Sequence, residues 1–442
     1  MIVVKASIKL QWPDEIQKFS DYTAGIVNTY ASSTAYKRKS NKYTNKQIND
    51  IFKEQFNYDL LVLNYETLND DKVIKQLKKE NIEFMYVDEI HVIKSVKAKR
   101  SRSLYKMNYV PYKFGATATP IQKDPLDIYS IYKFLKPGLF SNISDFKSMY
   151  IKYNYYGFPV GSINEKILHR KIKPYMSIKS QDEVSKELPE LVIIPKYCEL
   201  YPKQLEVSNK LIEEIQEFKN QEYEIVKKYG SPEAARDKDE NIGKLDGNIM
   251  ARQTFAQEIA DTEELLDASD SNLAHAYLTG CESNKIKLFL DLLDEIFQAN
   301  EKVCVFSKYK RIQPILDSYI NNKFKDIEIA HISSDYTNEL RYQEVKRFKE
   351  NNNCKIILLS DAGAEGINLE SCQYLIEFEP ADSFLIQTQR RGRIVRASST
   401  HSTVYVYQLI AKESYDEIAL KIVKKKKTFS DTIVENQEKI KQ

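Results

Sequence analysis

The chain has 442 residues, enough for two or three domains with hydrophobic cores; 42% are hydrophobic and 29% charged, which is ordinary for a globular protein. The net charge is only +3, so any binding of nucleic acid must rely on local basic patches. No apolar run approaches the ~20 residues that span a membrane, and the first residues lack the features of a signal peptide. We therefore expect a cytoplasmic protein with no membrane partner. The five cysteines form no C-x-x-C pair and the five histidines show no metal-ligand spacing, which favours reduced thiols over a disulfide framework or a zinc site.

The first part of the chain is predicted to form a parallel sheet. Short apolar runs bounded by polar clusters predict strands at residues 2–4, 58–63, 82–87 and 112–116. Leu10 to Phe19 has helical spacing, and Ser7 stands where the strand turns into this helix. A serine there can cap a helix, and the backbone N–H groups can hold a phosphate, although a routine capped helix fits the segment equally well.

The run that ends at Val87 is followed by Asp88, Glu89, Ile90 and His91. Acids at the carboxyl edge of a parallel strand lie where α/β sheets bind ligands. In nucleotide motors the first carboxylate holds Mg²⁺ through water and the second polarises the water that attacks the γ-phosphate. Many strands end in solvated acids, so this pair needs support from the rest of the chain.

Two further features surround this sheet. Residues 94–102 are basic, and we interpret them as a solvated face, with direct DNA contact as the alternative. The strand at 112–116 leads into Thr117 and Thr119, which can relay the state of a bound nucleotide through hydrogen bonds or simply satisfy the loop backbone.

Residues 124–280 have mainly helical patterns, for example at 129–135 and 204–226, and the polar, glycine-containing segment 237–248 is predicted to be an exposed loop. A second α/β pattern follows, with a helix at 287–297. Its strands are predicted at 302–307, 327–332, 355–360, 374–378 and 403–409. A basic helix from about residue 414 closes the chain; its lysine run is a solvated helix end or a DNA contact.

Two loops of the second sheet carry candidate chemistry. Residues 361–369 contain Gly363 and Gly366, which allow a phosphate or sugar to approach the backbone closely. Residues 389–396 contain four arginines, of which Arg393 and Arg396 lie on one helical face. With no acids nearby in the sequence, these side chains would repel one another without an anionic partner such as a transferring phosphoryl group, unless a structural ion-pair network absorbs them.

In their order and spacing these segments resemble the Swi/Snf-type branch of the superfamily 2 helicases, which are ATP-driven motors that translocate on DNA. The resemblance runs through nearly the whole chain, with residues 88–91 similar to a DEAH box that has Ile in place of Ala. It extends through six further segments of the family pattern, at residues 3–19, 63–68, 115–122, 303–308, 361–369 and 389–396. The fold that it implies is α/β, with two RecA-like parallel-sheet lobes and helical insertions between them.

The resemblance also implies roles for individual residues. Asp88 would coordinate Mg²⁺, Glu89 would activate water, and Arg393 and Arg396 would be arginine fingers. Nucleotide binding would also use Gln389 and Gly366, and the coupling residues would be His91, Thr117 and Thr119. The residues implied to lie along the DNA backbone are Lys5, Ser7, Asn64, Ser307, Gly363 and Asn368.

Three departures from the family pattern stand out. Ala397-Ser398-Ser399 replaces the usual Gly-Gln after Arg396, and residues 379–383 replace a tryptophan-containing loop. No G-x-x-x-x-G-K-[S/T] phosphate loop occurs in the sequence, so the β- and γ-phosphates lose their main cradle. We expect a first lobe truncated at its N-terminus, whose sheet lacks a central strand and so exposes neighbouring edges, and a chain that by itself hydrolyses ATP very poorly. A split or misassigned coding region, with the missing piece on a preceding polypeptide, is the favoured explanation; a piece that joins in trans and a decayed remnant are the alternatives.

The predicted organisation is a truncated lobe 1 (1–123), a helical linker region (124–280), lobe 2 (281–411) and a C-terminal basic helix (412–442). The predicted function is ATP-dependent DNA translocation with ATP and Mg²⁺, on DNA held largely through its backbone. The alternatives are a non-catalytic DNA-binding remnant or scaffold, and the helicase subunit of a restriction or repair complex. Frequent Lys, Asn, Ile and Tyr indicate AT-rich coding and favour a bacterial or phage source.

Overall fold

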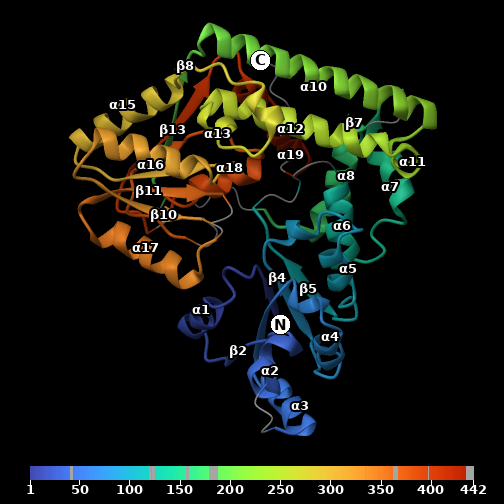
Figure 1. The fold of residues 1–442 in the computed structure, drawn as a ribbon. Helices are drawn as coiled ribbons and strands as arrows, with labels where there is room; N and C mark the ends of the chain where they lie inside the picture. Colours follow the sequence, from blue (N-terminus) through green and yellow to red (C-terminus); the bar gives the residue numbers. More distant parts are fainter. Residues whose placement is uncertain are drawn as a thin grey trace. The chain divides into compact units, whose positions relative to one another are not determined.

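The computed structural model describes residues 1–39, 43–118, 121, 125–155, 159–178, 188–333, 335–361, 367–396 and 398–434. The chain divides into two compact units, each built around its own parallel sheet (Figure 1). Unit 1 contains residues 1–152, 161–172 and the stretch from 430 onward, and unit 2 contains residues 153–160 and 173–429. Among the described residues, no helix is long and apolar enough to cross a bilayer.

The sheet of unit 1 has the strand order β2-β3-β1-β4-β5, and all of its strands are parallel. The strands are β1 (Ile2–Val4), β2 (Ala24–Ile26), β3 (Leu60–Asn64), β4 (Phe84–Val87) and β5 (Tyr112–Gly115). The helices are α1 (Trp12–Phe19), α2 (Tyr30–Lys39), α3 (Asn45–Glu54), α4 (Asp71–Leu77), α5 (Lys99–Tyr105), α6 (Leu126–Leu135), α7 (Ile143–Tyr150) and α8 (Glu165–Ile172). The four strands predicted for this part of the chain are confirmed, and β2 is an addition.

The cap predicted at the start of α1 is wrong. The helix begins at Trp12 after a turn, and Gln11, at the N-cap, makes no side-chain hydrogen bond. Pro13 stands in the first turn, where its fixed φ suits a helix start. On its inner side α1 contributes Trp12 and Ile16 to an apolar cluster with the central strand β1.

The outer side of β5 has no strand paired to it among the described residues. Tyr112 on this strand is 64% exposed, Phe114 is 50% exposed, and the ring of Phe114 stacks on Phe84 of β4 with centroids 4.8 Å apart. The five strands pair consecutively, and the expected lack of a further strand that would be central in the family sheet stays a prediction. The open edge lies at β5.

The sheet of unit 2 has the order β10-β11-β9-β12-β13-β8, again all parallel. The strands are β8 (Glu190–Cys198), β9 (Val303–Ser307), β10 (Glu328–Ile332), β11 (Cys354–Ser360), β12 (Tyr374–Glu377) and β13 (Thr403–Ala411), and a separate two-stranded sheet is formed by β6 (Ile151–Tyr153) and β7 (Pro159–Ser162). The helices are α10 (Pro202–Tyr229), α11 (Pro232–Lys238), α12 (Asn241–Asp261), α13 (Glu264–Asp267), α14 (Asn272–His275), α15 (Asn284–Gln298), α16 (Ile312–Lys323), α17 (Asn338–Glu350), α18 (Phe384–Arg391) and α19 (Tyr415–Val434). The five predicted strands are confirmed, and β8 was not anticipated.

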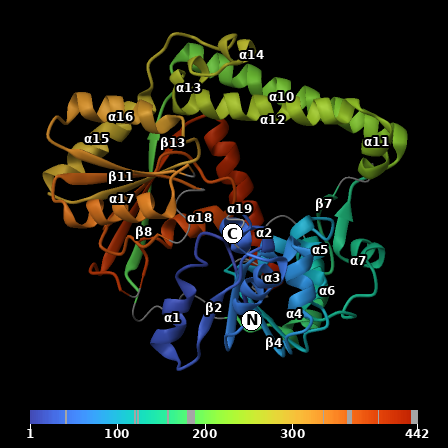
Figure 2. The ribbon, with the colours of Figure 1, turned by 60° about the horizontal axis from the view of Figure 1, so that its bottom comes forward.

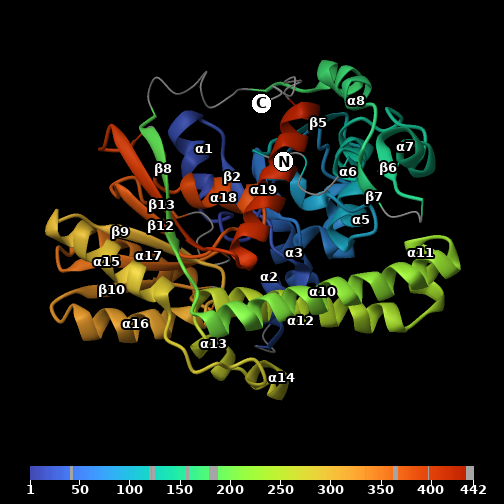
Figure 3. The same ribbon diagram turned by 90° about the horizontal axis from the view of Figure 1, so that it is seen from above.

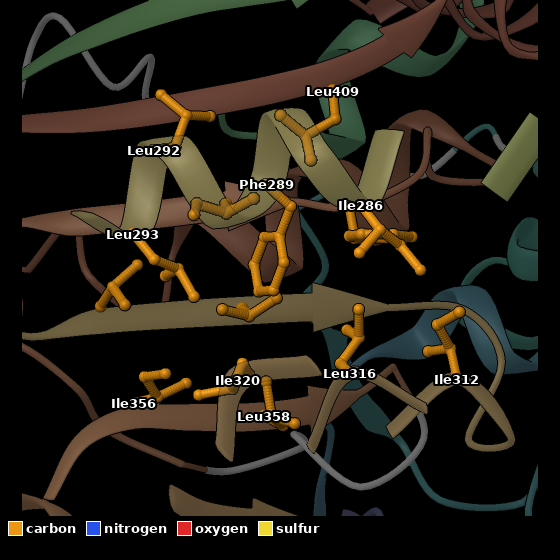
Figure 4. Close-up of a cluster of buried hydrophobic side chains, with 14 of the residues drawn as sticks. Ile286, Phe289, Leu292, Leu293, Ile312, Leu316, Ile320, Ile356, Leu358 and Leu409 are labelled. Carbon is orange, nitrogen blue, oxygen red and sulfur yellow. The ribbon is translucent and has the colours of Figure 1, made fainter. Parts of the chain in front are cut away.

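Helices cover both faces of this second sheet. Helices α15 and α16 pack on one face, where the ring of Phe289 lies at the centre of an apolar cluster (Figure 4). The other face packs against Phe348 of α17 and the segment after α18, including Ile394. Alternate residues of β9 and β11 enter the two clusters, as expected for strands buried on both sides.

The long helices α10 and α12 lie side by side (Figures 2 and 3). The loop predicted at residues 237–248 is wrong, because most of this segment belongs to α12. Ile242, Leu245 and Ile249 are spaced three or four residues apart and buried, and Ile242 packs against Val226 of α10. Tertiary packing thus outweighs the helix-weakening effect of Gly243 and Gly247.

Candidate functional site

Asp88 and Glu89 stand at the carboxyl edge of the first sheet, as the sequence predicts. The N–H of Asp88 donates to the carbonyl of Val3 (2.8 Å), which continues the pairing of β4 with β1. Glu89 then adopts a left-handed backbone with φ of 48°, which is costly for a residue with a side chain and is typical of functional turns. The N–H of Ile90 donates to Ala116 (2.9 Å) and joins this turn to the end of β5.

The electrostatics at this edge favour a cation. Burial, and next the charge of Glu89, raise the pKa of Asp88, while Lys5 and His91 act in the opposite direction. The hydroxyl of Tyr65 donates to the carbonyl of Asp88 (2.5 Å), and burial raises the pKa of this phenol strongly. Two adjacent carboxylates are hard oxygen donors suited to Mg²⁺. No cluster of three His, Cys, Asp or Glu that could hold a metal is found in the described ranges, so Asp88 would need ligands from water or substrate.

His91 links the acidic turn to the loop after β5. Its Nδ1 lies 2.9 Å from Oε2 of Glu89 and 2.8 Å from the hydroxyl of Thr117, and the imidazole is 5% exposed. Of the coupling residues implied by the resemblance, the structure therefore brings His91 and Thr117 together. Thr119 lies outside the described residues.

Three of the residues implied to contact DNA lie in unit 1, in a turn and at a strand end. Lys5 and Ser7 lie in the turn between β1 and α1. Asn64, at the end of β3, uses its amide within the protein: its Nδ2 donates to Glu66 (2.7 Å), and its Oδ1 accepts from Thr67 (2.6 Å) and from Lys9 (3.3 Å).

The basic segment at 94–102 reaches the same network. Glu66 pairs with Arg100 of α5 (2.6 Å), which ties that segment to the end of β3. Sequence reasoning missed the contacts of Lys9 with Asn64 and of Glu66 with Arg100, because these partners are far apart in the sequence.

Unit 2 places its candidate residues at the carboxyl ends of its strands. Ser307, at the end of β9, is 2% exposed and its hydroxyl contacts the carbonyl of Tyr309, so it supports the loop from inside. Asn368, after β11, is exposed. Gly363 and Gly366 lie outside the described residues.

The four arginines around α18 divide into two pairs. Arg390 is bound to Asp361 (2.7 and 2.9 Å), and Arg391 is bound to Glu377 (3.1 and 3.2 Å). The sequence-based argument that an anion is needed is wrong for these two, since acids 29 and 14 residues away neutralise them.

The other pair lies beyond the end of α18 at Arg391, so the prediction that Arg393 and Arg396 share a helical face is wrong. Arg393 donates to the carbonyl of Ile367 (3.3 Å), and the Nε of Arg396 is buried without a hydrogen-bond partner among the described residues. Gln389 is half-buried on α18, four residues before Arg393. A buried guanidinium N–H without a partner fits an anionic group such as phosphate.

Family models match both halves of the chain: the SNF2-related domain at residues 1–247 and the helicase conserved C-terminal domain at residues 284–398. The chain is 22% identical to TATA-binding protein-associated factor BTAF1 of Arabidopsis thaliana over 98% of its own length and 22% of the relative. It is 24% identical to ATP-dependent helicase fft1 of Schizosaccharomyces pombe over 100% of its own length and 48% of the relative. It thus spans less than half the length of these two relatives. Among solved structures it is similar to the Sulfolobus solfataricus SWI2/SNF2 ATPase core in complex with dsDNA, with 21% identity, a TM-score of 0.41, and coverage of 98% of this chain and 81% of that one.

Proposed function

Because the chain belongs to the SNF2-related family, whose domain model covers more than half of it, we propose that it forms the ATP-dependent DNA translocase part of a Swi/Snf-type helicase. The observation that carries this proposal is the His91 contact, which joins the acidic turn of Glu89 to the Thr117 loop. Such a junction lets a change beside a nucleotide phosphate reach a second loop of the same sheet. Relatives described as ATP-dependent helicases support the proposal.

In the proposed mechanism each residue has one task. Asp88 would hold Mg²⁺ through water, and the metal would supply charge neutralisation at the phosphates. Glu89 accepts a proton from the attacking water, with its carboxylate oriented by His91. Arg393 and Arg396 would donate to the γ-phosphate, and Gln389 would help to place the nucleotide. DNA is held through its backbone, with the exposed Asn368 as a contact on unit 2.

We further propose that a separate strand–loop–helix segment completes unit 1 and supplies the phosphate loop that these 442 residues lack. The open edge of β5 and its exposed aromatic residues support this proposal. Parallel sheets in α/β proteins are covered on both faces, and a strand beside β5 followed by a helix would pair the edge and cover Phe84 and Phe114. The carboxyl end of such a strand would meet the same edge as Asp88.

A non-catalytic DNA-binding scaffold is the second candidate, and the missing phosphate loop favours it. The two candidates differ in their response to nucleotide. A scaffold binds DNA identically with and without ATP, even after the phosphate-loop segment has been added.

The test measures ATP hydrolysis by residues 1–442, with and without duplex DNA, alone and joined to a phosphate-loop segment encoded directly upstream. We expect background turnover from 1–442 alone and DNA-stimulated turnover from the completed protein. In the completed protein, Glu89→Gln should lower kcat by roughly 10²- to 10⁴-fold while ATP binding persists. DNA-stimulated turnover by 1–442 alone would refute the need for completion, and nucleotide-independent DNA binding by the completed protein would favour the scaffold.

A further inference from the structure

Tyr65 is a buried tyrosine whose hydroxyl contacts the acidic turn at Asp88 and Glu89. The residue directly follows β3 and is 2% exposed. Its hydroxyl lies 2.5 Å from the carbonyl oxygen of Asp88 and 3.2 Å from that of Glu89, and it donates to both. Because β1 lies between β3 and β4 in the sheet, this contact joins the ends of two strands that are not neighbours. No local sequence pattern reveals it, since the two acids lie 23 and 24 residues from Tyr65.

The two carbonyls that accept this hydroxyl define the backbone conformation of Glu89. The carbonyl of Asp88 belongs to the peptide unit before the Cα of Glu89, and the carbonyl of Glu89 belongs to the unit after it. The rotations of these units about that Cα are φ and ψ, here 48° and 49°, a left-handed conformation that is costly for a residue with a side chain. A donor that holds both units therefore fixes the direction in which the side chain of Glu89 leaves the backbone.

A separate set of contacts holds the same turn from the side of β5. The N–H of Ile90 donates to the end of β5, and Nδ1 of His91 lies 2.9 Å from Oε2 of Glu89. These contacts act on the second peptide unit and on the carboxylate, whereas Tyr65 also reaches the carbonyl of the first unit at Asp88. Burial, and next the charges of the two acids, raise the pKa of the phenol, so its hydroxyl remains a donor at neutral and mildly alkaline pH.

We propose that Tyr65 is a positioning residue, whose hydroxyl holds the left-handed turn at Glu89 and so aims the carboxylate that accepts the proton of the attacking water. The inference rests on the proposed function, which gives Glu89 that task. Tyr65 acts through the backbone of the turn and has no chemical task of its own. Removing the hydroxyl lets the two peptide units rotate and displaces the carboxylate, and a displacement of about 1 Å at a catalytic group can cost roughly 10²-fold in rate.

The experiment compares Tyr65→Phe with Tyr105→Phe in the completed protein and measures kcat and KM for ATP with saturating duplex DNA. Phenylalanine keeps the ring and removes only the hydroxyl. Tyr105 is the matched control, because its hydroxyl contacts the carbonyl (3.1 Å) and the hydroxyl (2.8 Å) of Ser130 and so joins α5 to α6. We expect Tyr65→Phe to lower kcat roughly 10- to 100-fold with KM within about twofold, and Tyr105→Phe to change neither by more than about twofold. An unchanged kcat in Tyr65→Phe, or equal losses in the two variants, would overturn the inference.

A second background separates positioning from a general loss of stability. If Tyr65 acts through the carboxylate of Glu89, then Tyr65→Phe should lower kcat by no more than about twofold in a protein that already carries Glu89→Gln. Equal fold losses in the two backgrounds would mean that the hydroxyl supports unit 1 in general, and the positioning role would be wrong.

The chain 1–442 alone provides a test that does not depend on turnover. Hydrogen exchange at the N–H of Ile90 reports opening of the turn, and Tyr65→Phe should speed this exchange at least about tenfold relative to Tyr105→Phe. Unchanged exchange contradicts the inference whether or not the completed protein hydrolyses ATP. A completed wild-type protein without DNA-stimulated turnover refutes the proposed function instead.

A rescue experiment applies if Tyr65→Phe does not fold. Adding Glu89→Gly should then restore folding, because glycine adopts a positive φ at little steric cost and no longer needs the hydroxyl to hold it there. A double variant that stays unfolded would contradict the role assigned to the hydroxyl.

Discussion

Aromatic side chains in the cores of unit 2 and on the sheet of unit 1 lie in very different surroundings. In unit 2, Phe289 and Phe306 are almost completely buried, because helices cover both faces of the sheet. In unit 1, Phe84 of β4 and Phe114 of β5 are about half exposed. Neither ring belongs to the apolar cluster that packs against α1. Both sheets arise from the same kind of sequence, short apolar runs that end in polar residues, so such a pattern predicts a strand but not how well the strand is covered.

This difference predicts that the exposed face of β4 and β5 contributes less to stability than the core of unit 2. A buried aromatic side chain contributes several kcal/mol through transfer from water and packing, whereas an exposed one gains little on folding. In addition, no strand in the described part of unit 1 pairs with the outer side of β5. Truncating one aromatic residue in each unit measures the comparison directly.

The largest expected effect is that of Phe289→Ala. The side chain is fully buried and its ring meets Phe378 edge-on at 5.5 Å, so the variant should lose about 3–5 kcal/mol of the free energy of unfolding of unit 2. Phe114→Ala, which removes a half-exposed ring, should cost less than ~1 kcal/mol. Urea titrations followed by hydrogen exchange in each unit provide the measurement, since a chain with two units need not unfold in one step. Similar costs at the two sites would mean that the β5 face is covered in solution.

The sequence predicts strands well and long-range partners poorly. Strands β9 and β11 are recognisable because each is a continuous apolar run. Strand β8 is not recognised because Pro195 and Lys196 interrupt its apolar run. It is held by nine paired positions with β13, which lies more than 200 residues away in the sequence. The candidate site residues likewise divide into those with a local sequence signal and those with distant partners. Asp88 and Glu89 are found at the predicted sheet edge, whereas the partners of Arg390 and Arg391 come from other strand ends and have no local sequence signal.

Buried carboxylates of unit 2 give the second prediction. Burial raises the pKa of Glu379 to about 8, and it raises those of Glu258 and Asp261 to about 7 each. An acid whose pKa is higher in the folded state binds more protons there than in the unfolded chain, so the stability of unit 2 should fall as pH rises from about 5 to 8. Exposed glutamates would give no such fall.

Glu379→Gln tests this reading. Glutamine can still accept the N–H groups of Lys308 and Tyr309, and the Oε2 that it replaces has no hydrogen-bond partner among the described residues. The variant should match wild type near pH 5 and be more stable at pH 8, with the slope of unfolding free energy reduced by up to one proton, about 1.4 kcal/mol per pH unit. Glu350→Gln, a 67%-exposed carboxylate on α17, serves as the control for a general charge effect. An unchanged slope in Glu379→Gln would show that this carboxyl ionises normally in the folded protein.

The smallest expected changes in stability come from removing one helix cap in each unit. Thr44 begins α3 of unit 1 with a capping box on Gln47 at the surface, whereas Ser283 begins α15 of unit 2, accepting from the N–H of Ile286 (3.1 Å) and donating to the carbonyl of Asp261 (2.5 Å). Thr44→Ala should cost about 0.5–1 kcal/mol, because water replaces the lost bond. Ser283→Ala should cost about 1–2 kcal/mol more than that, because it also leaves the buried Asp261 carbonyl without this donor. Hydrogen exchange of the first turns of α3 and α15 measures both costs, and a larger loss at Thr44 than at Ser283 would contradict the view that burial in unit 2 sets the scale of its polar contacts.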